Sequence, residues 1–307
     1  MRRRLIAGMT PVLLLALAAC GGGDPLDEGG GGDSGGDSSS LIIGSANFPE
    51  NELLAEIYAQ ALEAQGVTVE RQFNIGAREL YLKALEDGSI DLLPEYNGAL
   101  LAFQSPDGPP EGVTAPQDVY DAVVEVLPDG IIALEQSEAE DKDTLTVTQE
   151  TATEFDLTTI EDLAPVAGDL SVAAGPEFAE RFQGLVGLEE VYGITFAEFT
   201  PLDAGGPLTL EALLSGQVDV SNIFSTDSAI ETENLVVLED TKNLFLAQNI
   251  VPIIREDKSN DTIESALNEV SAALTTENLT AALAQVTVDK MSSADVAEQF
   301  LTDNGLI

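Results

Sequence analysis

Histidine and tryptophan are absent from this chain of 307 residues, and cysteine occurs once. Without histidine, the chain can build neither a Ser-His-Asp or Cys-His catalytic arrangement nor a metal site with histidine ligands. Glycine-rich nucleotide-binding motifs are absent too. Carboxylates are numerous enough for a glycosidase pair or a Ca²⁺ site, but none falls in the pattern of an EF-hand loop. The sequence therefore gives no support to an enzyme, and we expect no catalytic residue, no cofactor and no bound metal.

Basic residues are also scarce. The chain has 12 Lys and Arg and 55 Asp and Glu, which gives a net charge of −43. A surface this negative repels nucleic acid and anionic lipid, which excludes nucleic acid as a partner. The charge could attract cationic solutes, or it could keep the protein soluble at high salt. The acidic residues are spread along the entire chain, which favours the role in solubility.

The first twenty residues predict an export signal. Three arginines at positions 2 to 4 precede an apolar run, residues 12–19, that is too short to span a bilayer. The ending Leu17-Ala18-Ala19-Cys20 resembles a bacterial lipobox, which implies a lipid on Cys20. The alternative is an ordinary signal peptide with a chance cysteine. We therefore expect residues 1–20 to be a lipoprotein signal peptide, and the mature protein to be extracytoplasmic and lipid-anchored to the cell membrane.

Residues 21–40 consist mainly of glycine, serine and aspartate. Such a segment has almost nothing to bury and is expected to be a flexible tether. About 267 residues remain, enough for one large domain or for two lobes with separate cores.

Predicted strands and helices alternate from residue 41 onward. Residues 41–45 form an apolar run, and the following helix at 50–65 carries apolar residues at helical spacing and stops at Gly66. A strand at 67–73, a helix at 77–87 and a strand at 90–93 come next. This alternation predicts an α/β fold in which helices cover a mostly parallel sheet.

A weak internal repeat indicates two lobes. Residues 82–92 match residues 210–220 at a constant offset of 128, and each copy runs from an apolar helix through a glycine into an apolar strand. Such corners are also common in unrelated α/β proteins. We predict one lobe at 41–140 plus 230–307 and the other at 141–229, joined by two hinge strands, with a ligand cleft between them.

Several short motifs are similar to those of one family. Gly44-Ser45-Ala46-Asn47-Phe48-Pro49-Glu50 resembles the GSKNFTE opening of osmoprotectant-binding proteins, the glycine betaine, choline and carnitine receptors of ABC importers. Further resemblances follow in the same order at 87–91, 95–98, 224–227, 236–240, 252–255 and 300–307. Together they cover essentially all of residues 41–307. The resemblance implies the two-lobed periplasmic-binding-protein fold of type II with two hinge strands.

The same resemblance implies a binding site. A quaternary ammonium cannot donate a hydrogen bond, so this family holds it against the faces of aromatic rings. Tyr96 falls on the tyrosine of that aromatic cage, and Phe224 stands where another aromatic residue is expected. Asp143 and Gln248 replace two further cage tyrosines. The pocket is therefore expected to be more polar than usual and to suit a ligand that forms hydrogen bonds.

Five more residues complete the predicted site. Ser45, Asn47 and Thr226 lie at the ends of predicted strands and could supply hydrogen bonds to a ligand. Phe48 belongs to the opening motif and is assigned to the same pocket. Arg78, at the start of a helix, could meet an anionic group of the ligand, or it could form a surface salt bridge.

These observations predict the solute receptor of an ABC importer, with a small organic solute as ligand and permease and ATPase subunits as partners. The solute is expected to be of the osmoprotectant type or a more polar relative. The alternative is a surface lipoprotein that uses the same fold for sensing or adhesion without transport.

Overall fold

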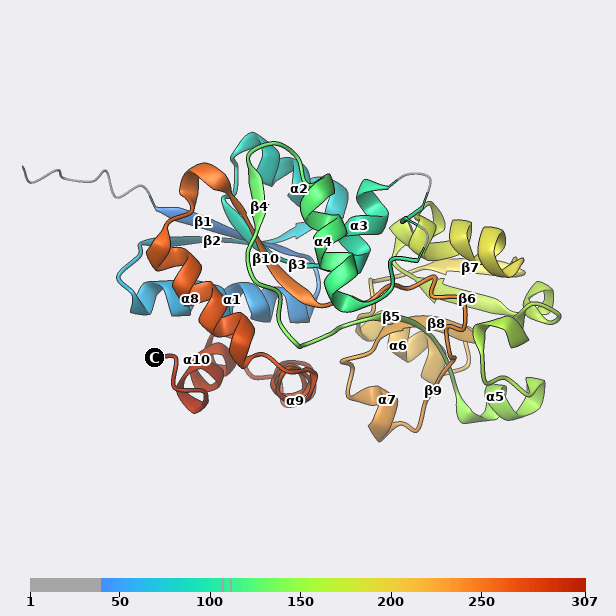
Figure 1. Ribbon diagram of the computed structural model, residues 1–307. Coiled ribbons are helices and arrows are strands. Elements are labelled where there is room, and N and C mark those ends of the chain that lie inside the picture. Colours follow the sequence, from blue (N-terminus) through green and yellow to red (C-terminus); the bar gives the residue numbers. More distant parts are fainter. Residues whose placement is uncertain (1–39, 106–107, 111) are drawn as a thin grey trace, which may run out of the picture. The chain divides into compact units, whose positions relative to one another are not determined.

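The structure is a computed structural model that describes residues 40–105, 108–110 and 112–307. The predicted signal peptide with Cys20, and all of the predicted tether except Ser40, lie outside the described residues. Two five-stranded mixed sheets form in the described part, and each has its own hydrophobic core (Figure 1). This arrangement confirms the predicted α/β fold with two lobes.

The first lobe contains the sheet with the strand order β2-β1-β3-β10-β4. Its strands are β1 (Leu41–Ala46), β2 (Val69–Gly76), β3 (Leu92–Tyr96), β4 (Ile131–Ala133) and β10 (Ile250–Arg255). Its helices are α1 (Pro49–Ala64), α2 (Arg78–Asp87), α3 (Asn97–Gln104), α4 (Pro116–Val126), η6 (Glu256–Lys258), α8 (Asp261–Ala273), α9 (Thr276–Thr287) and α10 (Ser293–Asp303). Strand β1 is parallel to β2 and β3, whereas β10 is antiparallel to β3 and β4. Helices α1, α8, α9 and α10 pack in one core, and α2, α3 and α4 pack in another.

The second lobe repeats this plan with the strand order β7-β6-β8-β5-β9. Its strands are β5 (Asp143–Val147), β6 (Ser171–Ala174), β7 (Glu198–Pro201), β8 (Val220–Phe224) and β9 (Val236–Val237). Its helices are α5 (Gln149–Phe155), η1 (Ile160–Leu163), η2 (Ala167–Asp169), η3 (Pro176–Ala179), η4 (Phe182–Val186), η5 (Leu188–Tyr192), α6 (Pro207–Leu214) and α7 (Ala229–Thr232). Strand β6 is parallel to β7 and β8, and β5 is antiparallel to β8 and β9.

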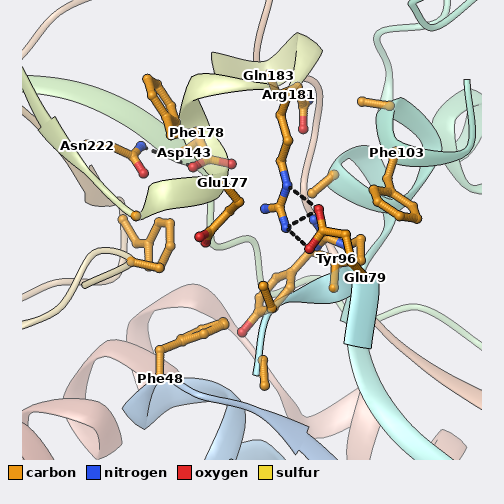
Figure 2. Close-up of a pocket in the computed structure, with 18 of the residues that line it drawn as sticks. Phe48, Glu79, Tyr96, Phe103, Asp143, Glu177, Phe178, Arg181, Gln183 and Asn222 are labelled. Atoms are coloured by element: carbon orange, nitrogen blue, oxygen red, sulfur yellow. Dashed lines mark hydrogen bonds and ion pairs between the residues drawn. The ribbon is translucent and has the colours of Figure 1, made fainter. Parts of the chain in front are cut away.

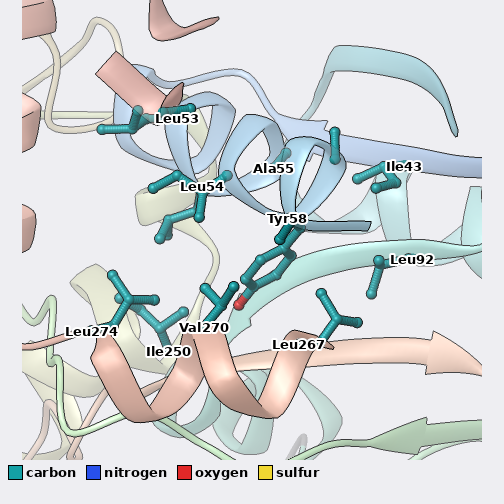
Figure 3. Packing of buried hydrophobic residues seen from close by; sticks show 14 of the residues in the cluster. Ile43, Leu53, Leu54, Ala55, Tyr58, Leu92, Ile250, Leu267, Val270 and Leu274 are labelled. Carbon is teal, nitrogen blue, oxygen red and sulfur yellow. The ribbon is translucent and has the colours of Figure 1, made fainter. Parts of the chain in front are cut away.

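Helix α1 is the centre of the first lobe's larger core. Its apolar residues recur at helical spacing, and Leu53, Leu54, Ile57 and Tyr58 are all fully buried. In Figure 3, several of these side chains face Ile43 of β1, Leu92 of β3 and residues of α8. Pro49 is favoured in the first turn of the helix, and Gly66 takes the left-handed conformation, φ 83°, just beyond its end. The helix therefore fixes the position of the chain that enters it, residues 47–50.

The internal repeat corresponds to equivalent corners of the two lobes. Helices α2 and α6 are each followed by a glycine with positive φ, Gly88 at 78° and Gly216 at 72°. Asp91 then accepts a hydrogen bond from the backbone nitrogen of Ile42 in β1 at 2.9 Å. Asp219 accepts the equivalent bond from Ser171 in β6 at 2.7 Å. Each aspartate thus ties the corner after a helix to the middle strand of the three parallel strands in its own sheet.

Two adjacent segments, residues 137–142 and 246–249, connect the lobes. They pair in antiparallel fashion at Glu140 and Asn249, and Asp141 N donates to Gln248 O at 3.1 Å. The first segment leads into β5 and the second into β10, the antiparallel strand next to the parallel trio in each sheet.

The return to the first lobe lies later than the predicted boundary between residues 229 and 230. Strand β9 pairs with β5 of the second sheet, and Leu238, Leu244 and Phe245 belong to the second lobe's core. Leu246 and Ala247, by contrast, pack in a core of the first lobe. The second lobe therefore extends to about residue 245. The predicted boundary is too early because the apolar run at 235–238 carries no sign of which sheet it joins, and it pairs with β5 of the second lobe.

Candidate ligand-binding cleft

A cleft of about 500 Å³ lies between the lobes, at the edges of both sheets. A cavity of this size suits a small organic molecule. Seven of the nine predicted ligand-binding residues line it: Asn47, Phe48, Arg78, Tyr96, Asp143, Phe224 and Gln248. Residues far apart in the sequence are therefore brought together in one place.

The two remaining predicted residues, Ser45 and Thr226, do not line the cleft. Ser45 is fully buried, because β1 changes register beside β2 at this point and the hydroxyl accepts a hydrogen bond from Asn74 N at 2.8 Å. Thr226 is 1% exposed, and its hydroxyl contacts two carboxyl groups beneath the cleft. Both residues do lie at strand ends, as predicted, but their hydroxyls serve the protein's own contacts.

Three aromatic rings from both lobes form one wall of the cleft. The ring of Phe48 lies 5.9 Å from that of Tyr96 and 5.4 Å from that of Phe224, measured between centroids, and both pairs are tilted. Gly205, at φ 56°, leaves room for Phe224, because a Cβ atom there would come within 2.5 Å of the Phe224 ring. Figure 2 shows Phe48 and Tyr96 at one side of the cleft. Such rings present negative faces to a cation.

Asp143 lines the same cleft and is held in place by two amide groups. Asn222 Nδ2 donates to Asp143 Oδ1 at 3.0 Å, and Gln248 Nε2 donates to Oδ2 at 3.0 Å. Asn222 Nδ2 also donates to the carbonyl oxygen of Thr144 at 3.0 Å, so the amide nitrogen is engaged on both sides. Because Asp143 is the strand partner of Phe224, the carboxylate and the ring are neighbours on the second sheet. The arrangement fixes a negative charge next to the aromatic wall.

Arg78 forms a buried ion pair, so the interpretation as a surface salt bridge does not hold. Its Nε donates to Glu95 Oε1 at 2.8 Å and its Nη2 to Oε2 at 3.2 Å, and the two residues are 8% and 0% exposed. Burial alone would lower the pKa of Arg78, but the Glu95 carboxylate raises it above the ordinary value. Tyr81 also donates to Glu95, and burial raises the pKa of this tyrosine well above its usual range. The Arg78 charge is thus largely neutralised within the protein.

Comparison with known proteins gives the family. Residues 39–303 match the family described as the substrate binding domain of ABC-type glycine betaine transport systems. The chain belongs to this family. It is therefore the substrate-binding component of an ABC-type importer, as the sequence motifs predict.

Relatives of this receptor support the assignment. The glycine betaine-binding protein YehZ of Escherichia coli is 26% identical over 275 residues, which cover 86% of the receptor and 90% of that protein. An ergothioneine transport permease/ergothioneine binding protein of Helicobacter pylori is 25% identical over 271 residues, covering 87% of the receptor and 48% of that protein. A solved glycine betaine/carnitine/choline ABC transporter structure superposes with a TM-score of 0.68 at 21% identity, covering 87% and 99% of the two chains, and confirms the fold.

The far wall of the cleft comes from a part of the receptor that the sequence motifs do not indicate. Residues 175–183, around η3, contribute Glu177, Phe178, Arg181, Phe182 and Gln183. Arg181 Nη2 lies 3.0 Å from Glu79 Oε2 of α2, so this ion pair joins the two lobes across the cleft (Figure 2). An arginine in a chain with so few basic residues is the one sequence signal that could have drawn attention to this segment.

The charges around the cleft favour a cationic ligand. Both arginines that line it are paired, Arg78 with Glu95 and Arg181 with Glu79. Asp143 and Glu177 also line it, and within the described residues neither forms an ion pair. Cation binding here would therefore use the rings together with unpaired carboxylates.

No helix within the described ranges is long and apolar enough to cross a membrane. Those ranges also contain no group of three or more His, Cys, Asp or Glu side chains placed to hold a metal ion. Substrate-binding proteins of ABC importers act outside the cytoplasm, which places this receptor there by its family.

Proposed function

We propose that the receptor captures a small organic cation or zwitterion whose positive group lies between the three rings and Asp143, and that it delivers this solute to a permease driven by an ATPase. The observation that carries the proposal is that three aromatic rings, those of Phe48, Tyr96 and Phe224, line the same cleft as the amide-held carboxylate of Asp143. Each ring contributes about 0.5–2 kcal/mol to binding a cation.

The ligand is expected to carry a hydrogen-bond donor, which glycine betaine lacks. Glycine betaine carries a carboxylate, which would enter a cleft where Asp143 and Glu177 are negative and both arginines are already paired. A hydroxyl or N–H group on the solute would instead donate to Asp143. A larger solute that combines a quaternary ammonium with such donors uses both the rings and the carboxylate.

Titration calorimetry with glycine betaine, choline, carnitine and ergothioneine tests this function. We expect one saturable site, with choline bound at least about tenfold more tightly than glycine betaine, which corresponds to about 1.4 kcal/mol. The variant Tyr96→Ala should lower the affinity of the receptor for every cation that it binds. If glycine betaine binds with low-micromolar affinity and this binding is lost in Tyr96→Ala, the receptor is an ordinary glycine betaine receptor and the proposed ligand preference is wrong. No saturable binding of any cation would contradict the proposed function.

We further propose that Cys20 carries the lipid anchor of the mature receptor. The lipobox-like ending at residues 17–20 and the extracytoplasmic role of the family support this proposal. The variant Cys20→Ala is expected to appear in the medium or to remain uncleaved, because stable anchoring requires two or more acyl chains. Fractionation of cells into membrane and medium measures the outcome. A processed variant that stays on the membrane would rule out the anchor.

A further inference from the structure

A buried contact at the base of the cleft joins both lobes and the connecting segment. Thr226, in the turn after β8 of the second lobe, contacts Glu50 Oε2 at the start of α1 in the first lobe. The same hydroxyl lies 2.9 Å from Asp141 Oδ1, on the connecting segment 137–142. Thr226, Glu50 and Asp141 are 1%, 2% and 3% exposed. Because Thr226 and Glu50 belong to different lobes, movement of one lobe away from the other would break this contact.

The Thr226 hydroxyl lies close to two carboxyl oxygens but has only one hydrogen to share between them. A threonine hydroxyl carries one hydrogen and can donate to only one acceptor at a time. The neighbouring donors do not reach Glu50 Oε2, because Tyr96 OH donates to Glu50 Oε1 at 2.8 Å and Thr226 N donates to Asp141 Oδ1 at 3.2 Å. With both carboxyls ionised, one close oxygen–oxygen contact would have no hydrogen. A single proton on the pair completes a chain in which Glu50 donates to Thr226 and Thr226 donates to Asp141.

The surroundings also favour a protonated pair. Burial raises the pKa of Glu50, and burial together with the nearby Glu50 raises that of Asp141 well above its usual range. The other titratable groups beside the pair are Tyr96 on β3 and Asp227 after β8, and Asp227 raises the pKa of Glu50 further. Among the described residues, the ion pairs include neither Glu50 nor Asp141. The arginine of this part of the cleft, Arg78, is engaged by Glu95.

We infer that Glu50, Asp141 and Thr226 form a proton-dependent latch, so that closing the lobes takes up about one proton. In the open receptor both carboxyls would meet water and ionise near their ordinary pKa of about 4. Between that pH and the higher pKa of the closed pair, the closed form binds more protons than the open form. The equilibrium constant for closing therefore falls as pH rises, by up to about tenfold per pH unit. Below and above this window it no longer depends on pH. This latch is independent of the solute's identity.

The latch has one consequence that rests on the proposed function. If the closed form is the one that holds the solute, then solute affinity falls with rising pH over the same window. The receptor would then release its solute more readily in a less acidic environment.

Small-angle scattering of the full chain without solute, from pH 5 to pH 8.5, tests the latch. The radius of gyration of the wild type should rise with pH. Glu50→Gln, which supplies a permanent amide donor to Thr226 or Asp141, should keep a small radius throughout. Asp141→Asn gives a second, independent test if the first variant does not fold. Glu86→Gln removes one exposed carboxylate of the first lobe and should behave like the wild type.

Two results would overturn the latch. The first is a wild-type radius that does not change with pH. The second is a folded Glu50→Gln or Asp141→Asn variant that expands over the same pH range as the wild type. Because this experiment contains no solute, failure to find a ligand by calorimetry would contradict the proposed function and leave the scattering result unaffected.

Discussion

Asparagine in place of Asp143 is expected to lower the affinity of the receptor for choline by about 30-fold or more. The substitution keeps the size of the side chain and removes a charge from the cleft that the three rings line. Asp143 is already positioned by hydrogen bonds from Asn222 and Gln248, so a ligand cation meets a carboxylate that needs no reorganisation. Titration calorimetry of the wild type and the variant measures the difference.

Glu180→Gln is the matched control for this prediction. Glu180 also lines the cleft, but its side chain is exposed and forms no ion pair within the described residues. Removal of its charge should change choline affinity by less than about threefold, since exposed charges are screened by water. Equal losses in the two variants would mean that the cleft attracts cations only through its overall charge. If the Asp143→Asn variant binds choline with wild-type affinity, the charge of Asp143 does not contribute to ligand binding.

The variant Arg78→Met is expected to lower the free energy of unfolding by about 3–5 kcal/mol. Glu95 has no exposed surface and depends on Arg78 for its opposite charge, so removal of the guanidinium leaves a buried carboxylate without its cation. The double variant Arg78→Met with Glu95→Gln should recover part of the loss, because both charges are then absent. Urea denaturation followed by circular dichroism measures these free energies.

Arg181→Met provides the comparison for this second prediction. Arg181 also pairs with a glutamate of α2, but the Glu79 side chain is 46% exposed. Its loss is expected to change the free energy of unfolding by about 0–1 kcal/mol. If Arg78→Met is no more destabilising than Arg181→Met, burial of the Arg78–Glu95 pair does not make it more important to stability than the exposed pair.

Local sequence patterns predict those parts of the fold that depend on near neighbours. Helix α1 follows from the spacing of its buried residues and from Gly66, and the repeat at Leu82–Leu92 and Leu210–Val220 identifies two equivalent corners. The strand β9 is different, because its apolar run is visible in the sequence but only the pairing with β5 shows that it belongs to the second lobe. The boundary between the lobes therefore moves to a later residue than the sequence predicts.

The site shows the same division. Phe48, Tyr96 and Phe224 were accessible to prediction because each lies in a short motif at the end of a strand. Ser45 fulfils the same condition, yet the change of register in β1 turns its hydroxyl toward Asn74. The wall around Arg181 belongs to irregular turns whose position depends on the packing of the whole lobe. Sequence patterns alone do not place such a segment opposite α2.

The position of a bound cation tests the central claim most directly. In a crystal structure of the receptor with choline, we expect the quaternary nitrogen within about 6 Å of the ring centroids of Phe48, Tyr96 and Phe224, with the choline hydroxyl donating to Asp143. A cation bound outside the cleft between the lobes, or within it but away from both the rings and Asp143, would contradict the account.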